Sequence, residues 1–249
     1  MPIRRLALAA TLAVTALPVA ALDLGAMTPE EREAFRGEVR DYLLEHPEVL
    51  TEAISVLEQR EADRQVAADQ SLVQEHIEAI TSDGHSWVGG NPDGDVTVVE
   101  FMDYRCGYCR RAFQEVEDLV SGDGNIRFVL KEFPILGPQS ELASRFAIAV
   151  QQIHGDDAYK DVHDALMLMQ TDVTPDSLSR LAESLALDPA PILDRMDAAE
   201  VTEVIAQNHD LAQKLNISGT PTFVMGDQMV RGYVPLPSMQ ALVADERAG

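Results

Sequence analysis

The two cysteines of this chain, Cys106 and Cys109, are separated by two residues and stand where a predicted strand meets a predicted helix. Residues 96–102 before them are β-branched and apolar with one acid, which is typical of a buried central strand. Residues 110–120 after them place apolar side chains such as Phe113 on one helical face. A helix N-terminus favours an anion, so the pKa of Cys106 is expected below the free-thiol value of about 8.5. The sequence therefore predicts a reactive dithiol that closes and reopens a small disulfide.

The charge of the chain excludes some classes of partner. Among 249 residues there are 19 Lys+Arg and 42 Asp+Glu, which gives a formal net charge of −23. Loss of Arg4 and Arg5 with the segment described next would make it −25. Nucleic acids and anionic lipid surfaces are bound through basic patches, so we expect neither as a partner.

Residues 1–21 have the pattern of a secretory signal peptide. Arg4 and Arg5 precede an apolar stretch over residues 6–17, and small residues mark a cleavage site after Ala20 or Ala21. A membrane anchor would need about 20 apolar residues, more than this stretch provides. We therefore expect an exported, periplasmic protein that works where disulfides form and persist.

Residues 22–82 are predicted to be a helical segment. Thr28, Pro29 and Glu31 have the spacing of a capping box with proline at the first helical position. Apolar residues then recur every four positions, and a break at residues 46–47 separates a second, longer helix. This apolar stripe is too small to form a core alone, so we favour self-association, with packing on the same chain's second domain as the alternative. The number of copies cannot be read from so few repeats.

Residues 83–249 are predicted to be a mixed α/β domain. The first strand and the cysteine helix are followed by a strand over residues 125–131 and a helical insertion over about 138–210. A strand opened by Thr220-Pro221, a tight turn at residues 226–227, another strand and a last helix complete the order. The fold class is therefore α/β, with helices inserted midway along a mixed sheet.

The Cys-Gly-Tyr-Cys motif after a buried strand, the later Thr-Pro and the helical insertion together resemble the DsbA-like branch of the thioredoxin fold. The resemblance covers about residues 84–249. It implies that Glu100, six residues before Cys106, is a buried proton acceptor. It also implies that the Thr220-Pro221 peptide bond is cis and lies beside the sulfurs, where it aligns an extended substrate.

The exported helical extension is similar to that of the suppressor-of-copper-sensitivity C family, some members of which are trimeric disulfide isomerases. The dipeptide Gly107-Tyr108 and the threonine before Pro221 also resemble isomerases more than oxidases, whereas the helical insertion resembles an oxidase. The resemblance implies a thiol–disulfide oxidoreductase, an isomerase or reductase, acting on misfolded secreted proteins. It implies a homo-oligomer, with a trimer as one candidate, and a membrane thiol reductase or oxidase as redox partner.

Two alternatives remain open at this stage. The first is a monomeric dithiol oxidase of the DsbA type. The second is a metal-binding or chaperone protein in which Cys106 and Cys109 hold Cu(I), since soft thiolates suit that ion. The motif contains no further metal ligand, so we expect no cofactor and no metal site. The six histidines are predicted to lie on the surface, whereas the methionines are predicted to fill the core. These histidines are His46, His76, His85, His154, His163 and His209.

Overall fold

The computed structural model describes residues 25–248 and divides the chain into two compact units, up to Gln59 and from Arg60 onward. The predicted signal peptide lies outside the described residues. Within the described part, no helix combines the length and the apolarity needed to cross a membrane.

The first unit consists of α1 (Pro29–Glu45) and the first part of α2 (Glu48–Thr81). The predicted capping box is present: the Thr28 side chain accepts from the Glu31 backbone N–H, and the Glu31 carboxylate accepts from the Thr28 backbone N–H. No residue of α1 is buried, so the apolar stripe of this helix is at least partly exposed along its length. The two helices are separated at His46-Pro47, as the sequence predicts.

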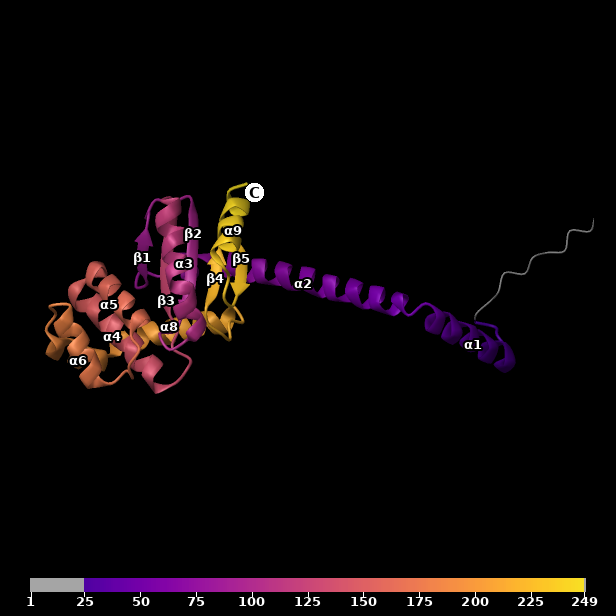
Figure 1. Ribbon diagram of the computed structural model, residues 1–249, viewed down its shortest axis with the longest axis horizontal. Helices are drawn as coiled ribbons and strands as arrows, with labels where there is room; N and C mark the ends of the chain where they lie inside the picture. Colours follow the sequence, from indigo (N-terminus) through magenta and orange to yellow (C-terminus); the bar gives the residue numbers. More distant parts are fainter. Residues whose placement is uncertain (1–24, 249) are drawn as a thin grey trace, which may run out of the picture. The chain divides into compact units, whose positions relative to one another are not determined.

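The second unit is built on a five-stranded sheet of order β1-β3-β2-β4-β5 (Figure 1). The central strands β2 and β3 are parallel, and every other pair is antiparallel. The strands are β1 (Trp87–Gly90), β2 (Val96–Met102), β3 (Ile126–Glu132), β4 (Thr222–Met225) and β5 (Gln228–Arg231). A two-residue turn, Gly226-Asp227, joins the last two strands, as expected for a tight hairpin.

Helices cover both faces of this sheet. Most of the core lies on the face of Val98 and Met102, where α3, α4, α5 and α9 pack. The helices of this unit are α3 (Gly107–Asp123), α4 (Pro138–His154), α5 (Asp156–Leu168), α6 (Pro175–Ser184), α7 (Pro189–Met196), α8 (Ala199–Lys214) and α9 (Leu236–Ala248). The run from α4 to α8 is the predicted helical insertion, and it extends to Lys214. The chain therefore has the α/β thioredoxin fold with an inserted helical block and an N-terminal helical extension.

The second face of the sheet is covered by α8 and by the second half of α2. Val73 and Ile80 are buried against Val99 and Val224 of the sheet, and Leu72 packs at the margin of this cluster. Two ion pairs hold the helix there: Asp69 of α2 with Arg231 of β5, and Asp83, just after α2, with the buried Lys131 of β3. The second half of the extension's apolar stripe thus packs on the same chain's sheet.

Candidate active site

Cys106 occupies the N-cap position of α3, directly after the loop that leaves β2. Both cysteines are free thiols and both are largely buried, Cys106 with 6% of its surface exposed and Cys109 with none. Cys109 lies in the first turn of α3 and faces the core beneath the loop. The helix N-terminus is therefore aimed at Cys106, which is the arrangement that stabilises a thiolate.

The contacts of Cys106 together favour its ionised form, although one of them favours the thiol. The protonated Cys106 Sγ donates to the carbonyl oxygen of Thr220 at 3.2 Å, which the thiolate cannot do. Hydrogen bonding from the Cys109 thiol lowers the pKa of Cys106 to about 5; burial opposes this effect, while the Thr220 side chain and the backbone N–H groups of Cys109 and Tyr108 reinforce it. At neutral pH Cys106 is accordingly a thiolate.

The second sulfur has the opposite character. Burial is the largest cause that raises the pKa of Cys109, followed by its hydrogen bond to Cys106 and the negative charge of Glu100. Cys109 is therefore protonated at neutral pH, and it becomes a nucleophile only when a nearby group accepts its proton.

Glu100 is a buried acid on the cysteine side of the sheet. It alternates along β2 with Val99 and Phe101, which face the other side, and it has 4% of its surface exposed. Burial is the largest cause that raises the pKa of Glu100 to about 8, and the negative charges of Cys106 and then Glu117 contribute to this rise. The acid that the resemblance nominates as a proton acceptor thus lies within electrostatic range of both sulfurs.

The remaining nominated residues surround the Cys106 sulfur. The Thr220-Pro221 peptide bond is cis, as the resemblance implies, and it leads directly into β4. Gly107 opens α3 with free space around its α-carbon, and Tyr108 is 60% exposed. The structure therefore brings all seven nominated residues together at one end of the sheet.

Asp103 was not singled out by the sequence analysis, yet it organises the loop before Cys106. Its Oδ1 accepts from the backbone N–H of Arg105 at 2.7 Å, and its Oδ2 accepts from those of Ile135 and Leu136 at 2.8 and 3.0 Å. One buried carboxylate thus ties the cysteine loop to the loop that follows β3. An aspartate between a strand and a Cys-X-X-Cys was the only sequence signal for this role.

A buried polar cluster adjoins this loop and was also missed. The Glu132 carboxylate accepts hydrogen bonds from Tyr104, Tyr159 and Ser144 at 2.6–2.7 Å. The predicted surface position of His163 is wrong, because only 2% of its surface is exposed and its Nδ1 lies 3.2 Å from the Tyr104 hydroxyl. Burial lowers the pKa of His163 to about 3, with a smaller contribution from Lys160, so the ring is neutral.

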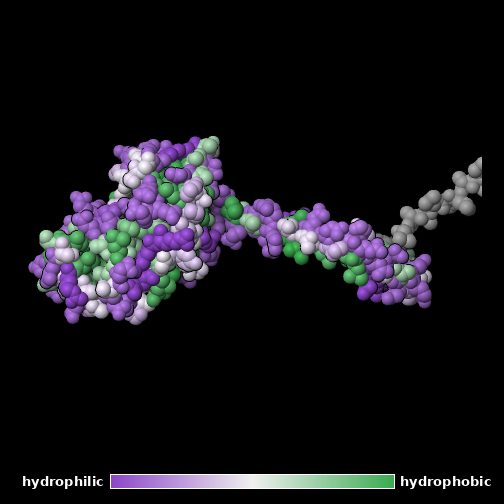
Figure 2. Space-filling view, in the orientation of Figure 1, coloured by the Kyte–Doolittle hydropathy of each residue, from purple (hydrophilic) through white to green (hydrophobic). Residues whose placement is uncertain are grey.

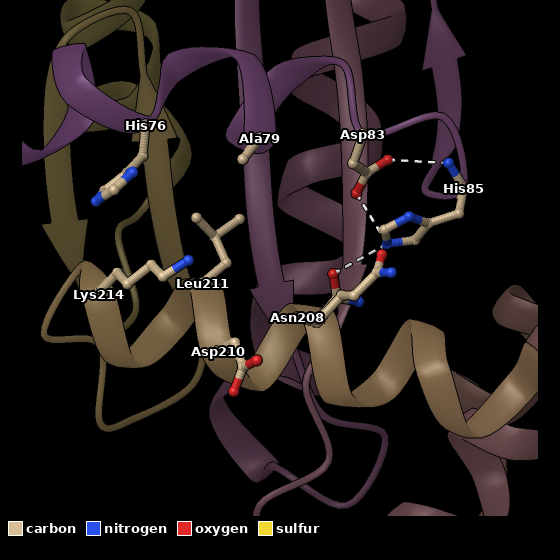
Figure 3. A pocket seen from close by; sticks show the side chains of 9 residues that line it. His76, Ala79, Asp83, His85, Asn208, Asp210, Leu211 and Lys214 are labelled. Atoms are coloured by element: carbon tan, nitrogen blue, oxygen red, sulfur yellow. Dashed lines mark hydrogen bonds and ion pairs between the residues drawn. The ribbon is translucent and has the colours of Figure 1, made fainter.

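A polar cavity of about 230 Å³ lies between α2, the loop after it and α8 (Figure 3). The side chains that close one end of it bind one another: His85 Nε2 lies 3.0 Å from Asp83 Oδ2 and 3.4 Å from Asn208 Oδ1. None of its lining residues belongs to the cysteine loop or to Thr220-Pro221. The chemistry of the sulfurs is therefore separate from this cavity.

Comparison with known protein families agrees with this geometry. Residues 97–244 match the model of the DSBA-like thioredoxin domain, and residues 31–64 match that of the copper resistance protein ScsC N-terminal domain. The first match covers more than half of the chain and contains both cysteines, Glu100 and Thr220-Pro221. The chain belongs to the DSBA-like thioredoxin family. This is a family of thiol–disulfide oxidoreductases, which the reactive Cys106 fits.

Several solved structures are similar to this chain. A thioredoxin-like oxidoreductase from Silicibacter pomeroyi is 44% identical, with 69% of this chain and 98% of that chain covered and a TM-score of 0.65. BcfH of Salmonella enterica Typhimurium is 28% identical, with 88% and 96% covered and a TM-score of 0.73. ScsC of Proteus mirabilis in a transitional conformation is 26% identical, with 91% and 99% covered and a TM-score of 0.65.

Segments similar to this chain also occur within much longer proteins. Two Na⁺/H⁺ antiporters, NhaA 3 of Salinispora tropica and NhaA 1 of Salinispora arenicola, are 30% and 32% identical over 158 and 165 residues. The chain spans about a quarter of the length of each, 24% and 25%.

Proposed function

We propose that this protein is an exported, periplasmic thiol–disulfide oxidoreductase that isomerises or reduces incorrect disulfides in misfolded secreted proteins. The observation that carries the proposal is the pair of sulfurs with opposite proton affinities at the start of α3. Cys106 has a pKa lowered to about 5, whereas the pKa of buried Cys109 is raised. Such a pair provides one sulfur that attacks at once and one that is held in reserve.

In the first step the Cys106 thiolate attacks one sulfur of an exposed disulfide in the client. The client S–S bond breaks, a Cys106–client disulfide forms, and the other client sulfur leaves as a thiolate. The Thr220 carbonyl and Pro221 lie beside Cys106 and precede β4, so an extended client segment can bind there in a strand-like manner.

The second step depends on Glu100. In the free enzyme the Cys106 thiolate is the second cause of the raised pKa of Glu100. The mixed disulfide has no charge on Cys106, so the pKa of Glu100 falls and its carboxylate form becomes available to accept the Cys109 proton. Cys109 then attacks the Cys106 sulfur, the Cys106–Cys109 disulfide forms, and the client leaves with both of its sulfurs reduced.

Isomerisation is the other outcome of the same intermediate. When a different client thiolate attacks the mixed disulfide first, a new client disulfide forms and Cys106 leaves as the thiolate, so no electrons are consumed. When Cys109 resolves the intermediate, two electrons are consumed, and a membrane thiol reductase is needed to reduce the Cys106–Cys109 disulfide again.

The N-terminal unit supports a homo-oligomer, with a trimer as one candidate state. Large apolar side chains are exposed on α1 and the first half of α2: Phe35, Val39, Leu44, Leu50, Ile54 and Leu57. Several of them border an apolar hollow of about 410 Å³ within this unit. Figure 2 shows hydrophobic residues, in green, interspersed with hydrophilic ones, in purple, along the helical extension. Exposed apolar surface of this kind marks a protein interaction site, and a second copy of the chain supplies a matching face.

The test is refolding of scrambled ribonuclease by the mature full-length protein, with its mass in solution measured in parallel. We expect an oligomer that restores ribonuclease activity in the presence of a reductant, and a Cys106→Ser variant of the same mass that does not. A monomeric protein that oxidises reduced ribonuclease but leaves the scrambled form inactive would overturn the isomerase proposal.

That outcome would favour the second candidate function, a monomeric dithiol oxidase. The observation on its side is the low pKa of Cys106. A stabilised thiolate stabilises the reduced enzyme and so makes its disulfide a stronger oxidant.

A further inference from the structure

Glu132 is a second buried acid on the cysteine side of the sheet, and the thiol chemistry proposed above does not use it. Along the parallel pair β2–β3, Glu100 is opposite Leu130 and Glu132 is opposite Met102. The two acids therefore lie diagonally on the same face of adjacent strands, two residues apart in register. Only 3% of the Glu132 surface is exposed.

The hydrogen bonds of Glu132 connect three parts of the domain. Its Oε1 accepts from Tyr104, two residues before Cys106, and from Tyr159 of α5, each at 2.7 Å. Its Oε2 accepts from Ser144 of α4 at 2.6 Å. The helical insertion is thus bonded to the cysteine loop through a single carboxylate.

Tyr159 extends the connection toward the sulfurs. Burial is the main cause that raises the pKa of Tyr159, but the negative charges of both Glu132 and Glu100 contribute. The Tyr159 ring therefore lies within electrostatic range of both acids, and Glu100 in turn feels the charge of Cys106.

The cluster can accept a proton without losing a hydrogen bond. In the carboxylate form, the Tyr104 hydroxyl donates to Glu132. When Glu132 gains one proton, its new O–H donates to the Tyr104 oxygen, and the Tyr104 hydroxyl turns to the neutral His163 Nδ1, 3.2 Å away. The number of protons on Tyr104 and His163 does not change, so the cluster gains the single proton that Glu132 takes up.

We propose that Glu132 is a second proton-accepting group of the redox site, a positioning residue coupled to the cysteine loop through Tyr104 and to Glu100 through Tyr159. Burial raises the pKa of Glu132 to about 7, while its bonds to Ser144, Tyr159 and Tyr104 oppose the rise. Its ionisation therefore changes close to neutral pH and alters how Tyr104 holds the loop.

Other polar groups around Glu132 are accounted for. Asp103 adds a smaller negative charge, and Lys160 acts on His163. The titratable or charged groups that face the cluster from the packed elements are Glu100 of β2, Asp103 and Tyr104 of the cysteine loop, Arg110 of α3, which donates to the Tyr104 carbonyl oxygen at 2.7 Å, and Tyr159, Lys160 and His163 of α5. Asn208 of α8 binds the Glu132 backbone carbonyl and carries no charge.

The chain contains a reporter for this cluster. Trp87 is the sole tryptophan, and its ring stacks on Tyr159 with the centroids 6.0 Å apart. The test is a fluorescence titration of the full-length protein between about pH 5 and pH 9, reduced and oxidised, which needs no client protein. We expect a transition near pH 7 that is absent in Glu132→Gln, where the amide carbonyl still accepts from a tyrosine but cannot ionise.

Matched variants distinguish this role from a merely structural one. Ser144→Ala removes one donor to the carboxylate, so the transition should move to higher pH rather than vanish. Glu100→Gln should retain the transition near pH 7, because Glu132 is unchanged. Coupling to the redox site predicts that the midpoint differs between reduced and oxidised protein by on the order of half a pH unit, and that Tyr159→Phe reduces this difference.

A wild-type transition that survives in Glu132→Gln, or that Ser144→Ala leaves in place, would overturn the assignment to Glu132. Equal midpoints in the two redox states would overturn the coupling. Failure of the isomerase proposal would alter neither titration, because only the dithiol and its disulfide enter the experiment. The inference rests on the proposed thiol chemistry, but the titration that tests it does not depend on isomerase activity.

Discussion

The sulfur of Cys106 lies 3.2 Å from the carbonyl oxygen of Thr220, although the two residues are 114 positions apart in the chain. The contact joins the N-terminus of α3 to the start of β4. The side chain of Thr220 also lowers the pKa of Cys106, so the protonation of this sulfur depends on a residue that the whole helical insertion separates from it.

Thr220→Val should raise the pKa of Cys106. The Thr220 side chain is one of the groups whose hydrogen bonds lower that pKa, and valine keeps the shape of threonine without the hydroxyl. A hydrogen bond to a charged group contributes about 1.5 kcal/mol, or about one pKa unit. The pH dependence of Cys106 alkylation measures the shift, with Thr51→Val on exposed α2 as the control. An unchanged profile would mean that the hydroxyl does not stabilise the thiolate.

Cys109→Ala should have a larger effect on the same pKa. The Cys109 thiol is the largest cause that lowers the pKa of Cys106, so its removal should raise that pKa by about one to two units. The variant should also accumulate a stable disulfide-linked adduct with a client, because no second sulfur resolves it. Non-reducing electrophoresis detects the adduct, and Cys106→Ala should form none.

Glu100→Gln should change how stability depends on pH. The pKa of Glu100 is raised from 4.5 to about 8 in the folded state, so the unfolded chain releases this proton at lower pH. The contribution of protonated Glu100 is fully present below pH 4.5 and is lost as the pH rises to about 8, by at most about 5 kcal/mol. Urea denaturation at several pH values should show this loss in the wild type and a smaller loss in the variant. Parallel curves would contradict a buried, protonated Glu100.

Lys131→Met should destabilise the fold strongly. Lys131 is completely buried and pairs with Asp83, so its loss leaves a largely buried carboxylate without its cation. Breaking such a pair typically costs about 3–5 kcal/mol. The double variant Lys131→Met, Asp83→Asn removes both charges and should recover part of the loss. Denaturation midpoints measure both, and a double variant less stable than the single one would contradict this account.

Ile54→Asp should dissociate the proposed oligomer without altering the thiol chemistry. Ile54 is 54% exposed on α2, and an aspartate there would place a charge in an apolar interface. Light scattering measures the mass, and Cys106 alkylation should keep its wild-type pH profile. Ser55→Asp, at the next and also exposed position, is the matched control. A wild-type mass for Ile54→Asp would exclude this face as the interface.

Local patterns were sufficient to predict much of the fold and the site. The apolar strand before Cys106 and the Thr-Pro at the start of β4 have strong sequence signals, so the α/β order is confirmed. Glu100 could be identified because it is the single acid in an apolar run, and the structure buries it with that run.

The buried polar groups could not be predicted in the same way. His163, Glu132 and Lys131 look like ordinary helix or strand-end residues, and their burial depends on partners 27 to 59 positions away. The packing of the second half of α2 on the sheet could not be predicted either, because its apolar residues suit either a partner copy or the sheet. The ion pairs of Asp69 with Arg231 and of Asp83 with Lys131 favour the sheet for this half of the helix.

The second half of α2 therefore determines where this domain can be cut and rejoined. The family match begins at residue 97, yet Val73 and Ile80 cover the sheet's second face, and Asp69 and Asp83 pair with Arg231 and Lys131 of the sheet. A chimera spliced at the family boundary would expose that apolar face and leave Lys131 without its counter-ion. In a chimera joined between Gln59 and Asp69, the second half of α2 stays with the sheet that it covers. Domains of this kind can therefore be exchanged intact at that junction.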